Sequence, residues 1–177
     1  YDDDTHLQKA LECLRVETAE EIPARCNAVF CVLLDQLVLQ ACKVTGRSEA
    51  ELDAFDFVVT TAHKHNKWSV HVTLDGSSAH DTSISPPRAS ILFAEQVDCR
   101  AFLGQAISQI EDENDAAAAA FLVDWCVYGT NRAMRLYWSS KALEPERRLM
   151  TMQERMQSPP PLQPNPITLL RSMITCA

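Results

Sequence analysis

The chain has 177 residues, a formal net charge of −8 and a hydrophobic content of 46%. This length suits one domain, or two closely joined halves, with enough apolar residues for a core. The net negative charge argues against binding nucleic acid over the whole surface, so any such site would be a local basic patch. Seven cysteines without a C-x-x-C pair indicate free thiols rather than a disulfide frame or a zinc finger. No apolar run approaches the roughly 20 residues of a membrane span, which predicts no membrane partner.

Hydrophobic periodicity predicts two helices at the start of the chain. The first covers residues 6–15 after a polar loop, with leucines recurring at helical spacing. The body of the second covers residues 24–43, with Pro23 in its first turn and Gly46 as its stop. The wide apolar face of this second helix predicts packing against a sheet.

Two strands are predicted next. Residues 55–61 are rich in strand-forming types, and residues 67–74 alternate between apolar and polar side chains. This alternation places Ser69 and His71 on the same face of the second strand. Glycine, serine and proline make residues 75–88 an exposed loop.

The second half again mixes predicted helices with other segments. Asp98 is a candidate cap for a helix that ends near Ile110. Residues 111–120 are acidic and alanine-rich and are expected to be a solvated connector, with a helical extension as the alternative. A charged, methionine-rich helix is predicted at residues 144–157, followed by a proline-rich spacer at 158–166. This order of elements indicates an α+β fold.

The chemically richest stretch is residues 121–141, FLVDWCVYGTNRAMRLYWSSK. The short apolar run over residues 121–128 predicts a buried strand that carries Asp124, where an unpaired charge would be costly. Three cations follow this run: Arg132, Arg135 and Lys141. A carboxylate beside several cations points to a site that holds a metal ion and a polyphosphate together. The alternative is a structural ion pair between an aspartate and an arginine.

The pattern D-x-x-VY-x-x-NR-x-x-RLY-x-SSK in this stretch resembles the third motif of the eukaryotic primase-polymerases, members of the archaeo-eukaryotic primase superfamily. Residues 67–71, KWSVH, resemble the K-x-S-x-H second motif of that family, and residues 169–176, LLRSMITC, resemble the segment that closes its catalytic core. The resemblance is dense at these three places and loose between them. It implies a primase-type catalytic core with mixed or antiparallel sheets and flanking helices.

The resemblance also implies an activity: a DNA-directed primase-polymerase, a nucleotidyltransferase of DNA replication and damage tolerance in the nucleus or mitochondrion. Such an enzyme uses Mn²⁺ or Mg²⁺ to join (deoxy)nucleoside triphosphates on a DNA template-primer. Asp124 would be a metal ligand and catalytic residue, and His71 a catalytic and phosphate-binding residue. The other nucleotide contacts would come from Lys67, Ser69, Arg132, Arg135 and Lys141. The alternative is a primase-fold module that binds nucleic acid or serves as a scaffold without catalysis.

The first motif of the family, a D-x-E pair, has no intact counterpart. We expect either that it precedes Tyr1, which we favour, or that Asp2 and Asp4 are its remnant. On either view the chain is a partial catalytic core that is not expected to polymerise alone. Three segments are expected within it: 1–110 with the second motif, 111–157 with the third, and 158–177 with the spacer and the closing segment.

Overall fold

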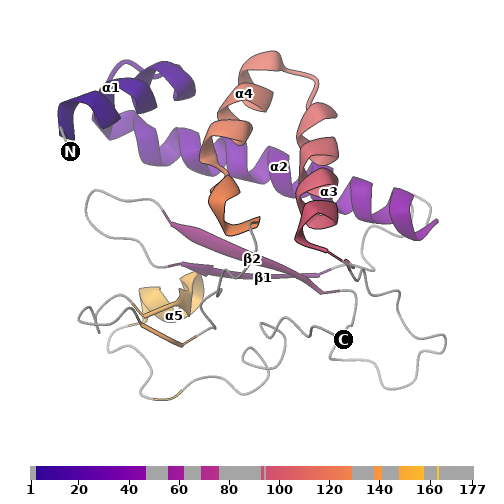
Figure 1. Cartoon of the computed structure of the whole chain (residues 1–177). Helices are drawn as coiled ribbons and strands as arrows, with labels where there is room; N and C mark the ends of the chain where they lie inside the picture. The colour runs from indigo at the N-terminus through magenta and orange to yellow at the C-terminus, as the bar shows by residue number, and fades with distance from the viewer. Residues whose placement is uncertain are drawn as a thin grey trace. The chain divides into compact units, whose positions relative to one another are not determined.

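The computed structural model describes residues 3–46, 56–61, 69–75, 93, 95–128, 138–140, 148–157 and 163. These residues form an α+β structure, as predicted (Figure 1). The chain divides into two compact units, each assembled from two separate stretches of sequence. Unit 1 comprises Tyr1–Leu52 and Phe93–Arg132, and unit 2 comprises Asp53–Leu92 and Ala133–Ala177. The units therefore do not coincide with the three consecutive segments expected from the sequence.

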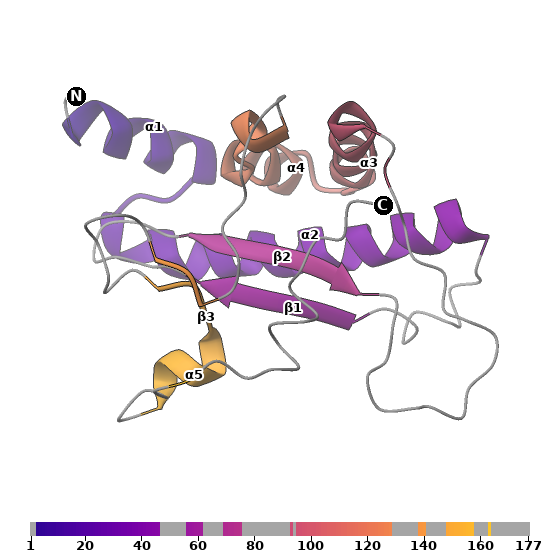
Figure 2. The ribbon, with the colours of Figure 1, turned by 60° about the horizontal axis from the view of Figure 1, so that its bottom comes forward.

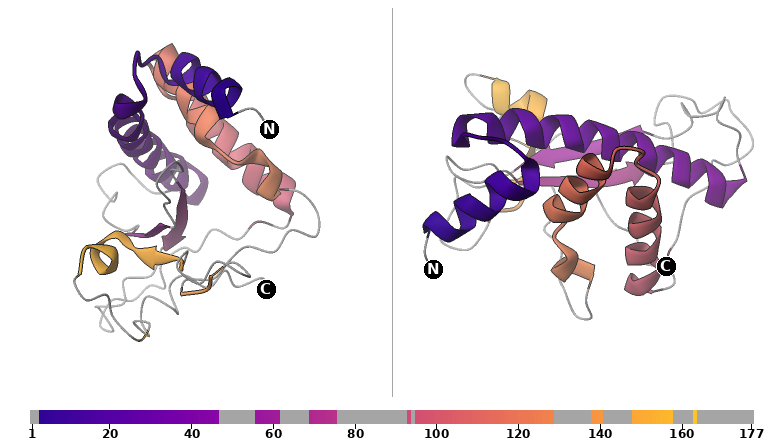
Figure 3. Two further views of the ribbon diagram at one scale, coloured as in Figure 1. Left: turned by 90° about the vertical axis from the view of Figure 1, so that its left-hand side faces the viewer. Right: turned by 90° about the horizontal axis from the view of Figure 1, so that it is seen from above.

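Unit 1 is helical (Figure 3). In chain order its elements are α1 (Asp3–Leu14), the 3₁₀ helix η1 (Ala19–Glu21), α2 (Ile22–Thr45), α3 (Gln96–Ser108), α4 (Glu113–Leu122) and the 3₁₀ helix η3 (Trp125–Tyr128). The two predicted N-terminal helices are confirmed, although α1 begins at Asp3, earlier than predicted. Helix α3 is also confirmed, with Glu95 at its N-cap and Asp98 three residues inside, where its carboxylate accepts from the Glu95 N–H at 3.1 Å.

Helix α2 is the longest element of unit 1, and local signals set both of its ends. Pro23 lies in the first turn, where its missing N–H costs nothing. Gly46 ends the helix with φ of 67°, a left-handed conformation that glycine adopts without steric penalty. The apolar face between these ends packs against α1, α3 and α4. These contacts lie within unit 1, and packing of α2 against a sheet stays a prediction.

The core of unit 1 is formed by small, branched and aromatic side chains from four helices. Its buried members are Leu14, Cys26, Val29, Leu33, Ala41, Cys42, Phe102, Leu103, Ala106, Ile107, Ala118 and Ala119. One polar group lies among them: Gln40 is 5% exposed, donates to Gln105 Oε1 at 2.6 Å and accepts from Gln109 Nε2 at 2.8 Å. These bonds satisfy the buried amide and fix the position of α2 against α3.

The length and composition of α2 are also those of a membrane span, contrary to the sequence-based exclusion. The segment Ala19–Thr45 has 27 residues and a mean hydropathy of 1.6 in its most apolar window, of which 28% is buried. Core helices and signal sequences meet the same criteria, so these properties alone do not place α2 in a bilayer.

Helix α4 replaces the connector expected at residues 111–120. Asp112 caps it by accepting from the backbone N–H groups of Asn114 at 2.8 Å and Asp115 at 2.9 Å. The five alanines that follow have the highest helix propensity of any residue, and two of them are buried. The helical extension left open for this segment is therefore the correct alternative, and it continues through Leu122.

Unit 2 contains a small antiparallel sheet of β1 (Asp56–Thr61), β2 (Val70–Asp75) and β3 (Met150–Thr151), in the order β2-β1-β3 (Figure 2). The two predicted strands are thus confirmed. The helix predicted at residues 144–157 is wrong in its described part, because β3 comes first and only Met152–Met156 forms α5. Thr151 stops the strand and starts the helix, since its Oγ1 accepts from the Glu154 N–H at 3.2 Å.

Candidate functional site

The sheet of unit 2 has one polar face, and it carries two of the predicted site residues. His71 pairs directly with Thr60 on β1, and Thr60 pairs with Thr151 on β3. Directly paired residues project to the same side of an antiparallel sheet, so an imidazole and two hydroxyls form a row across three strands. Ser69 lies immediately before β2, and the strand alternation predicted from the sequence would place it on this face.

The burial of these side chains is graded across the sheet. Thr60 in the central strand is 4% exposed, whereas Ser69 and His71 are half-buried. Ser69 and His71 are therefore partly exposed to solvent. Both groups can donate hydrogen bonds to a phosphate oxygen, which makes this face chemically suited to an anionic ligand.

Asp124 belongs to unit 1, and its local structure differs from the predicted buried strand. Helix α4 continues to Leu122, and the next residues bend into η3. The Asp124 side chain is exposed, and its Oδ1 accepts from the backbone N–H of Cys126 at 3.2 Å. A short apolar run can belong to a strand or to a helix end, and here the strong cap and the alanines upstream favour the helix.

The exposure of Asp124 bears on its two sequence-based interpretations. A buried aspartate–arginine ion pair is wrong for this carboxylate, because it reaches solvent. An exposed anionic oxygen is chemically suited to a hard cation such as Mg²⁺ or Mn²⁺. Among the described residues, however, no group of three or more histidines, cysteines, aspartates or glutamates is placed to hold a metal ion. The described residues alone therefore do not provide a three-ligand metal site around Asp124.

The surroundings of η3 shift the pKa of Tyr128. Burial raises the pKa of its phenol to about 12, with smaller contributions from Cys99 and from the Asp124 carboxylate.

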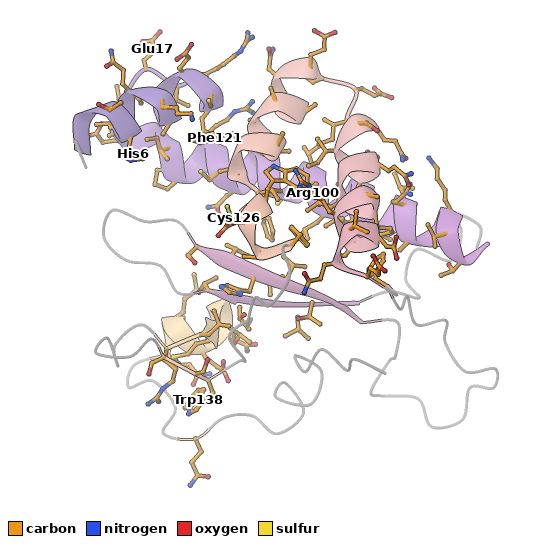
Figure 4. All side chains as sticks on the ribbon, viewed as in Figure 1. His6, Glu17, Arg100, Phe121, Cys126 and Trp138 are labelled. Carbon is orange, nitrogen blue, oxygen red and sulfur yellow. The ribbon has the colours of Figure 1, made fainter. Side chains whose placement is uncertain are left out.

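Trp125, also in η3, contacts α4 and α3. Its indole donates to the Ala120 carbonyl at 2.9 Å, and the Arg100 guanidinium lies 5.5 Å from the ring centroid. Figure 4 labels Arg100 on α3 and Cys126 on η3. Arg100 and Trp125, with Val97, Ala101 and Gly104, line a shallow cleft of about 410 Å³.

The remaining predicted nucleotide contacts are not located by this structure. Lys67, Arg132, Arg135 and Lys141 lie outside the described residues. Ser69 and His71 belong to unit 2 and Asp124 to unit 1. Ser69 and His71 therefore lie in the same unit, two residues apart in the chain.

Sequence reasoning did not single out Trp138 and Arg148, which form a second contact between an arginine and a tryptophan. The Arg148 Cζ lies 4.7 Å from the Trp138 ring centroid. Trp138 stands within the third-motif stretch, at the variable position of RLY-x-SSK, and Arg148 is ten residues further on. The sequence shows a tryptophan within a cationic segment, which suggests a contact with an arginine. It does not show that Arg148 is the arginine in contact with this ring.

No protein-family model matches this chain, and no curated protein and no solved structure matches it either.

Proposed function

We propose that the chain forms part of the catalytic core of a metal-dependent, DNA-directed primase-polymerase. The observation that carries the proposal is the pairing of His71 on β2 with the buried Thr60 on β1, with Ser69 immediately before β2. The motif resemblance assigns Ser69 and His71 to a phosphate, and the geometry suits that role. An exposed Asp124 carboxylate, available to a cation, is the second supporting feature.

In the proposed reaction a terminal hydroxyl on the primer attacks the α-phosphate of a nucleoside triphosphate. A new bond forms between the primer oxygen and the α-phosphorus, and the bond from the α-phosphorus to the oxygen that bridges to the β-phosphate breaks. Pyrophosphate leaves, and the hydroxyl proton passes to solvent. Mn²⁺ or Mg²⁺ would supply charge neutralisation for these oxygens. His71 and Ser69 would hold phosphate oxygens by donated hydrogen bonds, and Asp124 would provide a metal ligand.

Nucleotide binding is the direct test of the β2 face. Calorimetry of the purified chain with a nucleoside triphosphate and Mn²⁺ should show binding that falls about tenfold or more in the double variant Ser69→Ala/His71→Ala, because two phosphate donors are lost. Thr73→Ala, which alters the same face further along β2, is the matched control and should bind like the parent. Equal affinity in the parent and the double variant would refute this role of the face.

Catalysis is tested separately, by primer extension with the protein encoded by the complete reading frame that contains these residues. Asp124→Asn should reduce the extension rate by orders of magnitude if the carboxylate holds a metal ion. A parent protein that binds nucleotide but never extends a primer would instead identify the non-catalytic primase-fold module. An Asp124→Asn variant that extends primers at the parent rate would eliminate the catalytic role of this residue.

A further inference from the structure

The shallow cleft of unit 1 is built on one face of α3. Val97, Ala101 and Gly104 follow one another at intervals of four and three residues, so they lie on the same face of the helix. Val97 is 58% exposed, and a Cβ added at Gly104 would meet no atom within 4 Å. This face of α3 is therefore apolar and has space above it.

Trp125 on η3 supplies the aromatic part of the cleft, and its contacts hold the ring in place. Its indole N–H donates to the Ala120 carbonyl at 2.9 Å, and its ring centroid lies 6.2 Å from that of Tyr128. Because the N–H already has an acceptor, the indole offers a ligand apolar carbon surface. The volume of the cleft, about 410 Å³, falls within the range of small-molecule sites.

Arg100 places one positive charge at this apolar surface. Its side chain is exposed, and its Cζ lies 5.5 Å from the Trp125 ring centroid. Among the residues that the structure describes, no carboxylate forms an ion pair with this guanidinium. In a chain with 24 acidic residues against 16 lysines and arginines, an arginine without such a partner is available to an anionic ligand. The N–H groups of a guanidinium match the two oxygens of a carboxylate.

We propose that this cleft binds a small hydrophobic carboxylate, with the carboxylate on Arg100 and the apolar part against Trp125 and the α3 face. One guanidinium balances the single charge of a carboxylate. A phosphate monoester carries about −1.5 to −2 at pH 7 and would need further donors, which the apolar lining does not supply. The inference is independent of the proposed function, because none of the lining residues has a role in it.

The probe for this site is hydrocinnamate, a phenyl ring joined to a carboxylate by two methylene groups. It is titrated into the full chain in EDTA, and binding is followed by saturation-transfer NMR. We expect saturable binding with a Kd on the order of 1 mM, since a probe of this size in a shallow site binds weakly. Hydrocinnamamide, which keeps the shape and loses the charge, should bind about tenfold more weakly. Propionate, which lacks the ring, should be weakened by at least as much.

Two variants separate the charge from the apolar lining. Arg100→Gln should lower the affinity for hydrocinnamate about tenfold and leave the affinity for the amide unchanged. Gly104→Leu places a large side chain in the open space of the cleft and should abolish binding of both compounds. Lys9→Gln is the matched control, because it removes an exposed cation of α1 that does not line the cleft. It should bind hydrocinnamate like the parent, and the melting temperature of each variant shows that it is folded.

Three results would overturn the proposal. The first is a parent chain without saturable binding of hydrocinnamate at concentrations well above this Kd. The second is an Arg100→Gln variant that binds the acid as the parent does. The third is a folded Gly104→Leu variant with parental affinity, which would place the ligand outside the cleft. None of these measurements involves nucleotide, DNA or a metal ion, so their outcome is separate from that of the tests of Asp124 and of the β2 face.

Discussion

Arg25 and Asp115 connect α2 to α4 through a contact of 2.6 Å between Nη2 and Oδ1. The Nε of the same guanidinium donates to the carbonyl of Leu14 at 3.1 Å, at the end of α1. The two charged side chains are 25% and 23% exposed, so water screens them less than a surface ion pair. One arginine therefore links three helices of unit 1.

Replacing this arginine should destabilise unit 1. Arg25→Met removes the ion pair and the bond to Leu14, and we expect the free energy of unfolding to fall by about 1–2 kcal/mol. Asp115→Asn removes only the charge and should cost about half as much. Urea denaturation of both single variants and of the double variant gives the coupling energy. A coupling energy indistinguishable from zero would show that the contact between Arg25 and Asp115 does not stabilise unit 1.

Asp124→Asn should leave stability nearly unchanged, within about 0.5 kcal/mol. The side chain is exposed, and the asparagine oxygen can still accept from the Cys126 N–H. Breaking a buried ion pair would instead cost roughly 3–5 kcal/mol. Thermal melting of the parent and the variant distinguishes these values, and a loss of the larger size would mean that Asp124 has a structural partner.

Tyr128 should make stability fall at high pH. Burial, with smaller effects of Cys99 and Asp124, raises its pKa to about 12 in the folded chain, against about 10 in the unfolded chain. Between these values the unfolded chain loses the phenolic proton while the folded chain keeps it. The stability that depends on the protonated Tyr128 phenol is therefore present below pH 10 and is lost as the pH rises towards 12. The loss in the free energy of unfolding is about 1 kcal/mol at pH 11. The free energy of unfolding, measured with urea, should decline more steeply from pH 9 to 11 in the parent than in Tyr128→Phe. Parallel curves for the two proteins would contradict the pKa shift.

Two glycines should respond to alanine with opposite signs. At Gly46, with φ of 67°, an added Cβ meets no atom within 4 Å, so Gly46→Ala tests backbone strain alone and should cost about 1 kcal/mol. At Gly104, inside α3, an added Cβ also meets nothing within 4 Å, and Gly104→Ala should stabilise by about 0.5–1 kcal/mol. Melting temperatures that move in the same direction would contradict the left-handed cap.

The elements predicted correctly are those with a strong local signal. Alternation located β2, and Pro23 and Gly46 located the ends of α2, because period and capping are properties of neighbouring residues. The 121–128 segment was assigned wrongly, since its eight residues fit a strand as well as a helix end, and the cap at Asp112 that decides between them lies upstream. The pairing of Trp138 with Arg148 depends on which segments meet, which periodicity does not reveal.

For the candidate site, the strand that carries His71 followed from the period of two, but the exposure of Asp124 did not follow from its apolar neighbours. Burial depends on where the chain turns after α4, and one carboxylate within an apolar run gives no information about that turn.

The interleaving of the two units has a consequence for synthesis on the ribosome. Unit 1 needs residues 93–132 to cover α2, and these are made only after residues 53–92, which belong to unit 2. The apolar face of α2 therefore stays uncovered while residues 53–92, which belong to unit 2, are synthesised. Bringing residues 93–132 back to α2 then closes a long loop, which costs entropy. A nascent chain stalled before residue 93 should expose this face to chaperones, and no single cut in the chain can yield either unit whole.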